Sequence, residues 1–254
     1  MNELLIDSSD GVLTVTLNRL NKKNSLTRAM YAGMADALAQ ADADACLRAV
    51  VLQGHETVFC AGNDIGDFLN RLASGQESPA FQFLHAISIF SKPLVAAVCG
   101  PAVGIGTTML FHCDLVYAGD NAAFSMPFVN LGLCPEAASS YLAPQLMGYG
   151  RAAEALLLGE PFLAETALEM GLVSRIVPPS EASALAQRQA HKLAAKPLLS
   201  LIETKRLMKK SHAPIVAERL QEEGVSFARL LTEPAAREAF TAFLEKRKPD
   251  FSKA

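Results

Sequence analysis

The sequence is poor in charge: 19% of its 254 residues are charged, while 50% are hydrophobic. This composition excludes an intrinsically disordered chain. The 26 acidic and 23 basic residues give a net charge of −3 and form no block of like charge, so we expect no nucleic-acid partner. The length fits one large domain, or one domain with a helical appendage.

Cysteine pairs are lacking as well. The cysteines are odd in number and widely spaced, without a CxxC pair, and no two histidines stand at metal-ligand spacing. We therefore expect buried free thiols in a reducing, cytoplasmic compartment, with neither a disulfide framework nor a metal site. The cysteines are Cys46, Cys60, Cys99, Cys113 and Cys134.

A clean membrane-spanning segment is also missing. Residues 93–113 carry no formal charge and are long enough to span a bilayer, but Pro101, three glycines and His112 interrupt them. A buried strand, a glycine turn and a buried helix explain this run better, so we expect no membrane span. Glu3 and Asp7 argue against a signal peptide.

Short apolar or alternating segments predict strands, and the segments between them predict helices. Strands are expected at residues 11–18, 46–53, 93–99, 115–117 and 123–124. The first helix follows a polar loop at 18–25, places Leu26 and Met30 on its apolar face, and has Ser25 or Thr27 available as its cap. Alternating strands and helices predict an α/β core over residues 1–195.

The pattern becomes helical and more charged from residue 196 to 254. Helices are expected at 197–211, 214–231 and 234–247, the last with an apolar stripe of Phe240, Phe243 and Leu244. Such a tail is longer than is needed to cap a core. It could fold back on the core or pack against another subunit.

Several catalytic motifs are absent, including GxSxG, HExxH and the phosphate-binding GxxxxGK[ST]. Two glycine-containing turns remain, at residues 58–65 and 98–108, each after an apolar strand. Free N–H groups in such turns attract negative charge, and two turns facing one point would form an oxyanion hole. Two ordinary tight turns in a packed core are the alternative.

Six segments in a fixed order carry a family resemblance. They are Asn18-Arg19 with Lys23-Asn24-Ser25-Leu26; Phe59-Cys60-Ala61-Gly62-Asn63-Asp64; Lys92-Pro93 with Gly100-Pro101-Ala102-Val103-Gly104; Cys113-Asp114-Leu115-Val116-Tyr117-Ala118; Gly171-Leu172-Val173; and Phe243-Leu244-Glu245-Lys246-Arg247. Together they resemble the crotonase (enoyl-CoA hydratase/isomerase) superfamily over essentially the whole chain. The resemblance implies a spiral of ββα turns, a C-terminal helical trimerisation region and a homotrimer or dimer of trimers.

The resemblance also implies an acyl-CoA thioester substrate, so that coenzyme A enters with the substrate and no separate cofactor is expected. The backbone N–H groups of Asn63 and Ile105 would hold the thioester oxygen. Loss of one such donor typically costs about 10²–10³ in rate. The residues expected to line the substrate are Ala61, Gly62, Asn63, Asp64, Ile65, Gly104 and Phe128.

The acids decide which reaction is expected. Enoyl-CoA hydratases of this superfamily use two glutamates, where this chain has Thr108 and Phe128. Glu136 is the acid that remains nearby, in an arrangement similar to that of the peroxisomal-type delta-3,delta-2-enoyl-CoA isomerases of fatty acid metabolism. A lone carboxylate can take a proton from C2 of a 3-enoyl-CoA and return it at C4. A solvated loop carboxylate is the alternative interpretation of Glu136.

Other functions stay open from the sequence: dienoyl-CoA isomerisation, hydration, or a catalytically silent acyl-CoA-binding protein. Arg19, Lys22 and Lys23 are candidates to bind the phosphates of coenzyme A, although a solvated face explains them nearly as well. His112 lies in an apolar run and is expected to be a core histidine.

Overall fold

The computed structural model describes residues 2–66 and 79–253. Its larger sheet has six strands in the order β1-β2-β3-β4-β6-β9. β1 is antiparallel to β2, and the other neighbours are parallel. The strands are β1 Leu4–Ser9, β2 Val12–Leu17, β3 Ala49–Gln53, β4 Leu94–Val98, β6 Leu115–Gly119 and β9 Arg175–Val177.

A smaller sheet lies beside the larger one, in the order β5-β7-β8. Its strands are β5 Pro101–Val103, β7 Ala123–Ser125 and β8 Phe162–Leu163. Along the chain, β4 joins the larger sheet and β5 the smaller, and β6 and β7 repeat this pattern. This repetition is the ββα spiral that the sequence resemblance implies, and the α/β prediction is confirmed.

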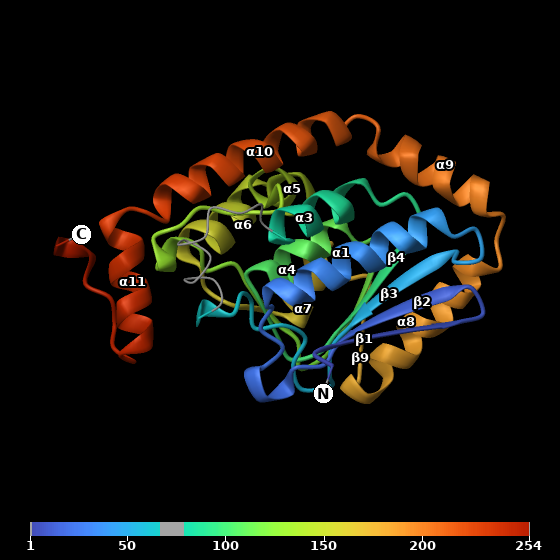
Figure 1. The fold of residues 1–254 in the computed structure, drawn as a ribbon, viewed down its shortest axis with the longest axis horizontal. Helices are drawn as coiled ribbons and strands as arrows, with labels where there is room; N and C mark the ends of the chain where they lie inside the picture. Colours follow the sequence, from blue (N-terminus) through green and yellow to red (C-terminus); the bar gives the residue numbers. More distant parts are fainter. Residues whose placement is uncertain (1, 67–78, 254) are drawn as a thin grey trace.

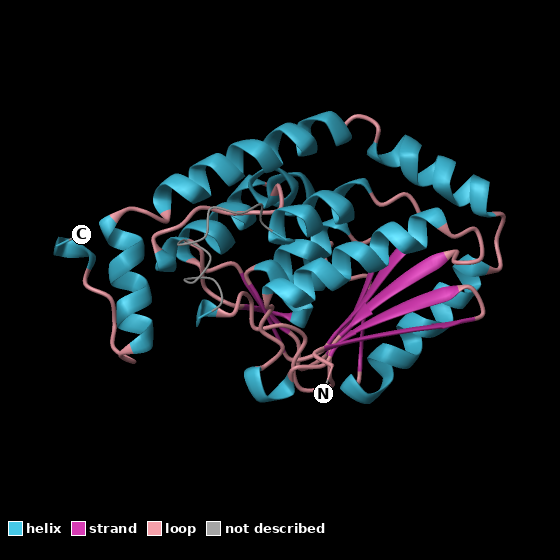
Figure 2. Ribbon diagram, in the orientation of Figure 1, coloured by secondary structure: helices cyan, strands magenta, loops and turns pink. Residues whose placement is uncertain are grey.

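Helices cover both faces of the larger sheet, as Figures 1 and 2 show. α1 (Arg28–Ala43) and α3 (Pro79–Ile89) pack together on one face, and α8 (Pro179–Ala194) contacts β3, β4 and β6 on the other. Because both faces are covered, β4 is buried at every residue, which explains why its sequence does not alternate.

The first helix differs slightly from its prediction. Thr27 is its N-cap, and the Thr27 hydroxyl accepts a hydrogen bond from the Met30 N–H at 3.3 Å. The helix therefore begins at Arg28, and Leu26 is buried outside it, where it forms an isolated parallel bridge with Asn63.

Short elements follow the spiral and complete its turns. The uncharged run at 93–113 forms β4, β5 and two short helices, as expected from its glycine turn. In the described part of the chain, no helix is both long and apolar enough to cross a bilayer. The remaining elements are η1 Leu20–Lys22, α4 Ile105–Thr108, η2 Met109–His112, η3 Val129–Leu131, α5 Ser139–Met147, α6 Tyr149–Ala153, η4 Glu154–Leu158, α7 Ala164–Glu169 and η5 Phe251–Lys253.

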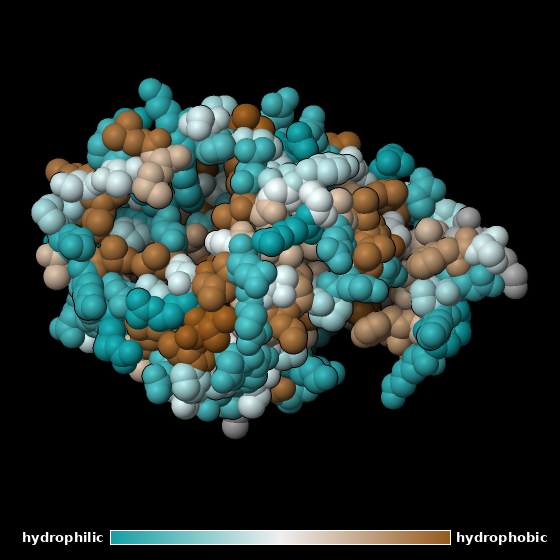
Figure 3. Space-filling model, turned by 180° about the vertical axis from the view of Figure 1, so that it is seen from behind, coloured by the Kyte–Doolittle hydropathy of each residue, from teal (hydrophilic) through white to brown (hydrophobic). Residues whose placement is uncertain are grey.

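Three helices end the chain: α9 (Leu198–Lys209), α10 (Ala213–Leu230) and α11 (Pro234–Leu244). α10 folds back over α3 and α5, and Val216 and Leu220 on α10 belong to the main core. The end that carries α11 projects from the body of the molecule, with an open notch beneath it (Figure 3).

Two expectations about side chains need correction. The apolar stripe of α11 is split, because Phe240 is buried whereas Phe243 and Leu244 are 58% and 62% exposed. All five cysteines are free, but only Cys60 and Cys99 are buried. Cys113 and Cys134 are half-buried, and Cys46 is exposed because it lies in the loop that follows α1.

Candidate active site

The first glycine-containing turn leaves one backbone donor unused. The Leu26 N–H donates to the Gly62 carbonyl at 2.8 Å, and the Asp64 N–H donates to the Leu26 carbonyl at 3.0 Å. Asn63 lies between these two bonds, so its own N–H points to the opposite side of the extended segment. Among the described residues, this N–H finds no acceptor.

The second turn presents a donor at the start of a helix. Gly104 has φ 56° and ψ −118°, a conformation that side-chain-bearing residues rarely adopt, and it directs the chain from β5 into α4. Its carbonyl accepts hydrogen bonds from the N–H groups of Thr107 and Thr108, both at 2.9 Å. The Ile105 N–H, in the first turn of α4, has no acceptor inside the helix.

The two turns are in direct contact. The Val103 N–H donates to the Cys60 carbonyl at 2.9 Å, and the Cys60 N–H donates to the Pro101 carbonyl at 3.0 Å. A Cβ on Gly106 would lie 2.7 Å from the Cys60 carbonyl oxygen, so only glycine permits this approach. The structure thus brings the segments of Asn63 and Ile105 into contact, which is one condition for an oxyanion hole.

Side chains from other elements support the first turn. The Tyr31 hydroxyl, on α1, donates to the Asn63 side-chain oxygen at 2.6 Å. Arg19 forms an ion pair with Asp64 at 2.8 Å and another with Glu3 at 2.7 Å. Asp64, expected at the substrate, therefore has its carboxylate engaged by Arg19.

Glu136 lies in an unusual turn just before α5. The next two residues, Ala137 and Ala138, both have left-handed backbone angles, with φ 63° and 55°, which is uncommon without glycine. Glu136 is half-buried, and its Oε1 atom is shielded from solvent. Burial raises the pKa of the Cys60 thiol to about 12, and the charge of Glu136 adds to this rise, which places the carboxylate near the first turn.

Two distant side chains hold this turn. The buried Glu223 carboxylate, on α10, accepts hydrogen bonds from the N–H groups of Ala138 at 2.6 Å and Ser140 at 2.9 Å. Burial raises the pKa of Glu223, while these hydrogen bonds favour its charged form. The His112 Nε2–H donates to the Ala137 carbonyl at 2.8 Å, since a carbonyl can only accept.

His112 is the buried histidine that the sequence suggests. It is 3% exposed, and burial lowers the pKa of its imidazole to about 4, so the ring is neutral at pH 7. Its hydrogen bond to Ala137 makes it part of the support of Glu136, a role that the apolar sequence context did not indicate. Tyr31 and Glu223 are also functional candidates that sequence reasoning missed.

Thr108 and Phe128, the two positions where the resemblance implies glutamates in hydratases, are both buried. Thr108 is fully buried, and in the described structure its hydroxyl has no hydrogen-bond partner. Phe128 is 5% exposed, and its ring lies 3.9 Å from the place of a Cβ on Gly104. Ile65 packs against the apolar cluster that contains Phe128. Three of the residues expected to line the substrate, Ile65, Gly104 and Phe128, therefore lie close together.

The basic candidates separate into two groups. The Arg19 side chain is only 14% exposed, and its guanidinium is occupied by carboxylates and by the Ser25 hydroxyl. Lys22 and Lys23 are exposed, at the end of η1 and next to it. The Lys23 carbonyl accepts a hydrogen bond from the Ala61 N–H at 3.0 Å, which ties this basic loop to the first turn.

A ββα spiral that presents two backbone donors near a carboxylate defines a crotonase-type protein. Residues 7–254 match the enoyl-CoA hydratase/isomerase family, and the chain belongs to this family. It superimposes on an enoyl-CoA hydratase/isomerase from Pseudoalteromonas atlantica with a TM-score of 0.94 and 39% identity, covering 98% of this chain and all of the other.

Curated relatives include both hydratases and isomerases. The chain is 32% identical over 252 residues to the 2,3-dehydroadipyl-CoA hydratase of Escherichia coli, covering 99% of each chain. It is 40% identical over 184 residues to enoyl-CoA delta isomerase 2 of Rattus norvegicus, covering 70% of this chain and 46% of the rat protein.

Proposed function

We propose that the protein converts a 3-enoyl-CoA into a 2-enoyl-CoA, with Glu136 as base and acid and the N–H groups of Asn63 and Ile105 as the oxyanion hole. One observation carries this proposal. Of the three positions considered for the acid, Thr108, Phe128 and Glu136, only Glu136 has a carboxylate. The partial similarity to an enoyl-CoA delta isomerase is in keeping with it.

The chemistry needs one base and two donors. The Glu136 carboxylate removes a proton from C2, and the electron pair of that C–H bond moves into a dienolate whose negative charge rests largely on the thioester oxygen. The two N–H groups stabilise that oxygen in the transition state. Glu136 then returns the proton to C4, which leaves the double bond between C2 and C3, in conjugation with the thioester.

The surroundings of Glu136 favour isomerisation over hydration. Phe128 and Leu133 are each 5% exposed and belong to one apolar cluster near the turns. An apolar wall disfavours an ordered water, and hydration would need a second group to position that water. Neither the Thr108 hydroxyl nor the Phe128 ring can act as a carboxylate base.

The decisive experiment compares the wild type with Glu136→Gln on trans-3-hexenoyl-CoA, following the absorbance of the conjugated 2-enoyl thioester. We expect the variant to lose at least about 10²-fold in kcat while it still binds acyl-CoA, because the amide keeps the size of the side chain but cannot take a proton. A variant with nearly normal turnover would contradict the role of Glu136.

Hydration is the second candidate, since the similarity to the Escherichia coli hydratase extends over 99% of both chains. It is tested by offering the same protein crotonyl-CoA and measuring loss of the conjugated absorbance. Hydration faster than isomerisation would replace the proposed reaction. If neither substrate reacts but acyl-CoA binds, the two functions left are another enolate reaction, such as dienoyl-CoA isomerisation, and a catalytically silent acyl-CoA-binding protein.

Several further features belong to the same proposal. Lys22 and Lys23 would bind the phosphates of coenzyme A, and coenzyme A would enter as part of the substrate, without a separate cofactor. The core domain would extend over 1–195 and the oligomerisation region over 196–254, although Val216 and Leu220 of α10 also pack into the main hydrophobic core. The free cysteines are in keeping with a cytoplasmic location.

A homotrimer or dimer of trimers is proposed as the assembly. Apolar side chains are exposed in two parts of the molecule, around η4 and on the C-terminal helices, and such surfaces are typical of subunit contacts. They include Tyr149, Leu157, Leu163, Leu199, Met208 and Phe243. Light scattering after size-exclusion chromatography measures the mass against 27.1 kDa for one chain.

A further inference from the structure

A second pocket lies apart from the turns that carry Asn63, Ile105 and Glu136. It has a volume of about 570 Å³ and is formed by residues of α3, η2, α5, α9 and α10. None of the residues proposed for the oxyanion hole, the base or the coenzyme A phosphates lines it. A volume of this size is typical of sites for small molecules.

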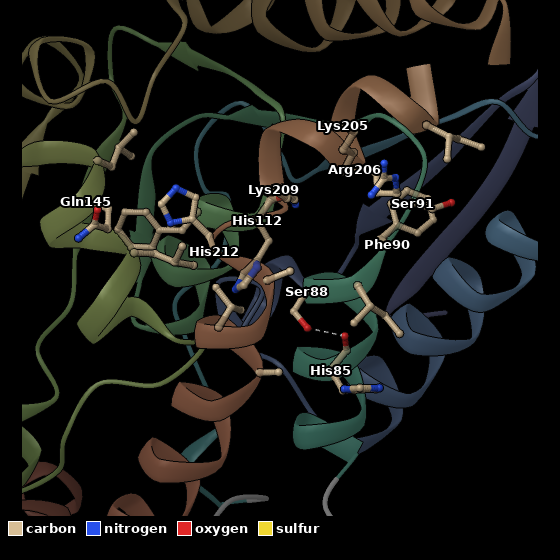
Figure 4. A pocket seen from close by; sticks show the side chains of 18 residues that line it. His85, Ser88, Phe90, Ser91, His112, Gln145, Lys205, Arg206, Lys209 and His212 are labelled. Atoms are coloured by element: carbon tan, nitrogen blue, oxygen red, sulfur yellow. Dashed lines mark hydrogen bonds between the residues drawn. The ribbon is translucent and has the colours of Figure 1, made fainter. Parts of the chain in front are cut away.

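The charged side chains that line this pocket are all basic. Its described lining contains Lys205, Arg206, Lys209 and three histidines, and no Asp or Glu. Figure 4 shows Lys205, Arg206 and Lys209 along α9, with His112 near Lys209. A carboxylate or another anion would therefore meet no like charge on the wall.

Two of these cations already have partners. The Lys205 ammonium donates to the Asp114 carboxylate and to the Lys92 carbonyl, both at 2.7 Å. Arg206 is exposed and pairs with Glu203 through two short hydrogen bonds. Neither group needs a further anion.

Lys209 is different. In the described structure its ammonium makes a single hydrogen bond, to the His112 carbonyl, and this bond is long at 3.4 Å. An ammonium can donate three hydrogen bonds, so most of its capacity is unused although the side chain is partly buried. Burial, followed by the charge of Lys205, lowers the pKa of Lys209 to about 8, which still leaves it mainly charged at pH 7.

The rest of the wall is largely apolar. Phe90 and Val216 are buried, Leu142 and Ile202 are half-buried, and Leu146 is 44% exposed at its edge. An anion with a hydrocarbon portion satisfies both parts of this surface, because the charged end pairs with Lys209 and the apolar end covers carbon. A fully hydrophilic anion would leave the apolar wall unused.

We propose that this pocket binds a small amphipathic monocarboxylate, with its carboxylate on the Lys209 ammonium and its hydrocarbon part against Phe90, Ile202 and Val216. This site is separate from the proposed catalytic one. Its wall nevertheless includes His112, the residue that supports the turn after Glu136, so the two sites share one side chain.

The test measures binding of decanoate to the whole protein by isothermal titration calorimetry. We expect saturable binding to the wild type, at least about 10-fold weaker binding to Lys209→Met, and no change in Lys210→Met, which removes an exposed neighbouring charge. Because the thioether of Met keeps the length and apolar stem of lysine, the comparison isolates the ammonium.

Three further measurements test the shape of the pocket, the charge of the ligand and the separation of the two sites. Ala217→Phe, at an exposed position of α10, should fill the pocket and weaken decanoate binding without lowering the unfolding temperature. 1-Decanol should bind at least about 10-fold more weakly than decanoate, because it lacks the charge. Octanoyl-CoA, which enters the catalytic site, should not displace decanoate.

The proposal is overturned if the wild type does not bind decanoate. This is the result expected if a second copy of the chain covers the pocket. It is equally overturned if Lys209→Met and Ala217→Phe bind normally, if decanol binds as well as decanoate, or if octanoyl-CoA competes. Because none of these readouts uses turnover, failure of the isomerase proposal would leave this one standing.

Discussion

The turns that carry Asn63 and Ile105 are joined to each other by main-chain hydrogen bonds, whereas the turn that carries Glu136 is tied to distant elements by the side chains of Glu223 and His112. Backbone bonds between Cys60, Pro101 and Val103 join the two donor turns. The turn of Glu136, the proposed base, depends on Glu223, which lies 85 residues from Ala138 along the chain, and on His112. The donors and the base therefore respond to different kinds of substitution.

Backbone donors and side-chain acids also differ in how they respond when a residue is replaced. A donor made by a backbone N–H survives the replacement of its side chain, so Ile105 can supply it as well as a smaller residue could. A carboxylate exists only where the side chain provides it, and the backbone of the two turns does not depend on a carboxylate at Thr108 or Phe128. The fold can thus keep its oxyanion hole while the acids vary.

The largest effect is expected from disturbing the main chain between the donor turns. In Gly106→Ala, the new Cβ would lie 2.7 Å from the Cys60 carbonyl oxygen, so the two turns must separate. We expect kcat on 3-hexenoyl-CoA to fall about 10²–10³-fold, the usual loss when an oxyanion donor is displaced. Gly150→Ala is the matched control, because a Cβ there meets nothing within 4 Å. Equal activity of both variants would show that the spacing of the turns is unimportant.

A smaller effect is expected from Glu223→Gln. The two N–H groups of Ala138 and Ser140 need two acceptors, and the amide offers one, so one buried donor is left unsatisfied at a cost of about 1–3 kcal/mol. We expect at least about a 10-fold drop in kcat with little change in KM, because the base shifts but the acyl-CoA contacts remain.

The control for Glu223→Gln is Glu222→Gln, which changes the neighbouring carboxylate, 59% exposed and paired with Arg219. It should behave like the wild type. If Glu223→Gln lowers only the unfolding temperature and leaves kcat intact, Glu223 supports the fold but does not position Glu136.

The last expected effect is a pH dependence of stability that arises at His112, beside the turn of Glu136. His112 has its pKa lowered to about 4 in the folded protein, against about 6.5 when exposed. Between these values the unfolded chain binds a proton that the folded protein does not, so stability falls as the pH is lowered from 6.5 towards 4. The contribution is about 2–3 kcal/mol over this window.

Urea unfolding of the wild type and His112→Gln at several pH values measures this contribution. The glutamine amide can still donate to the Ala137 carbonyl but does not titrate, so the difference between the two proteins should shrink or reverse as the pH falls. If the free energy of unfolding changes with pH in the same way in both proteins, protonation of His112 does not destabilise the fold.

Local patterns account for much of the fold. The buried strand β4, the cap at Thr27 and the glycine turn at Gly104 all follow from residues a few positions apart, where propensity and backbone angles act directly. The boundary at Arg28 and the split stripe of α11 were less predictable, because burial of Leu26 or exposure of Phe243 depends on neighbours far along the chain.

By itself, the sequence predicted the α/β core and the two glycine-containing turns, and it left Glu136 as the proposed acid. Only the tertiary structure revealed that Arg19 pairs with Asp64, that Glu223 and His112 hold the turn of Glu136, and that Lys209 faces a separate pocket. The physical reason is the distance along the chain over which each effect acts. Backbone propensity and turn geometry act over a few residues. Hydrogen bonds and burial join elements tens of residues apart, and no repeating sequence pattern predicts which residues meet.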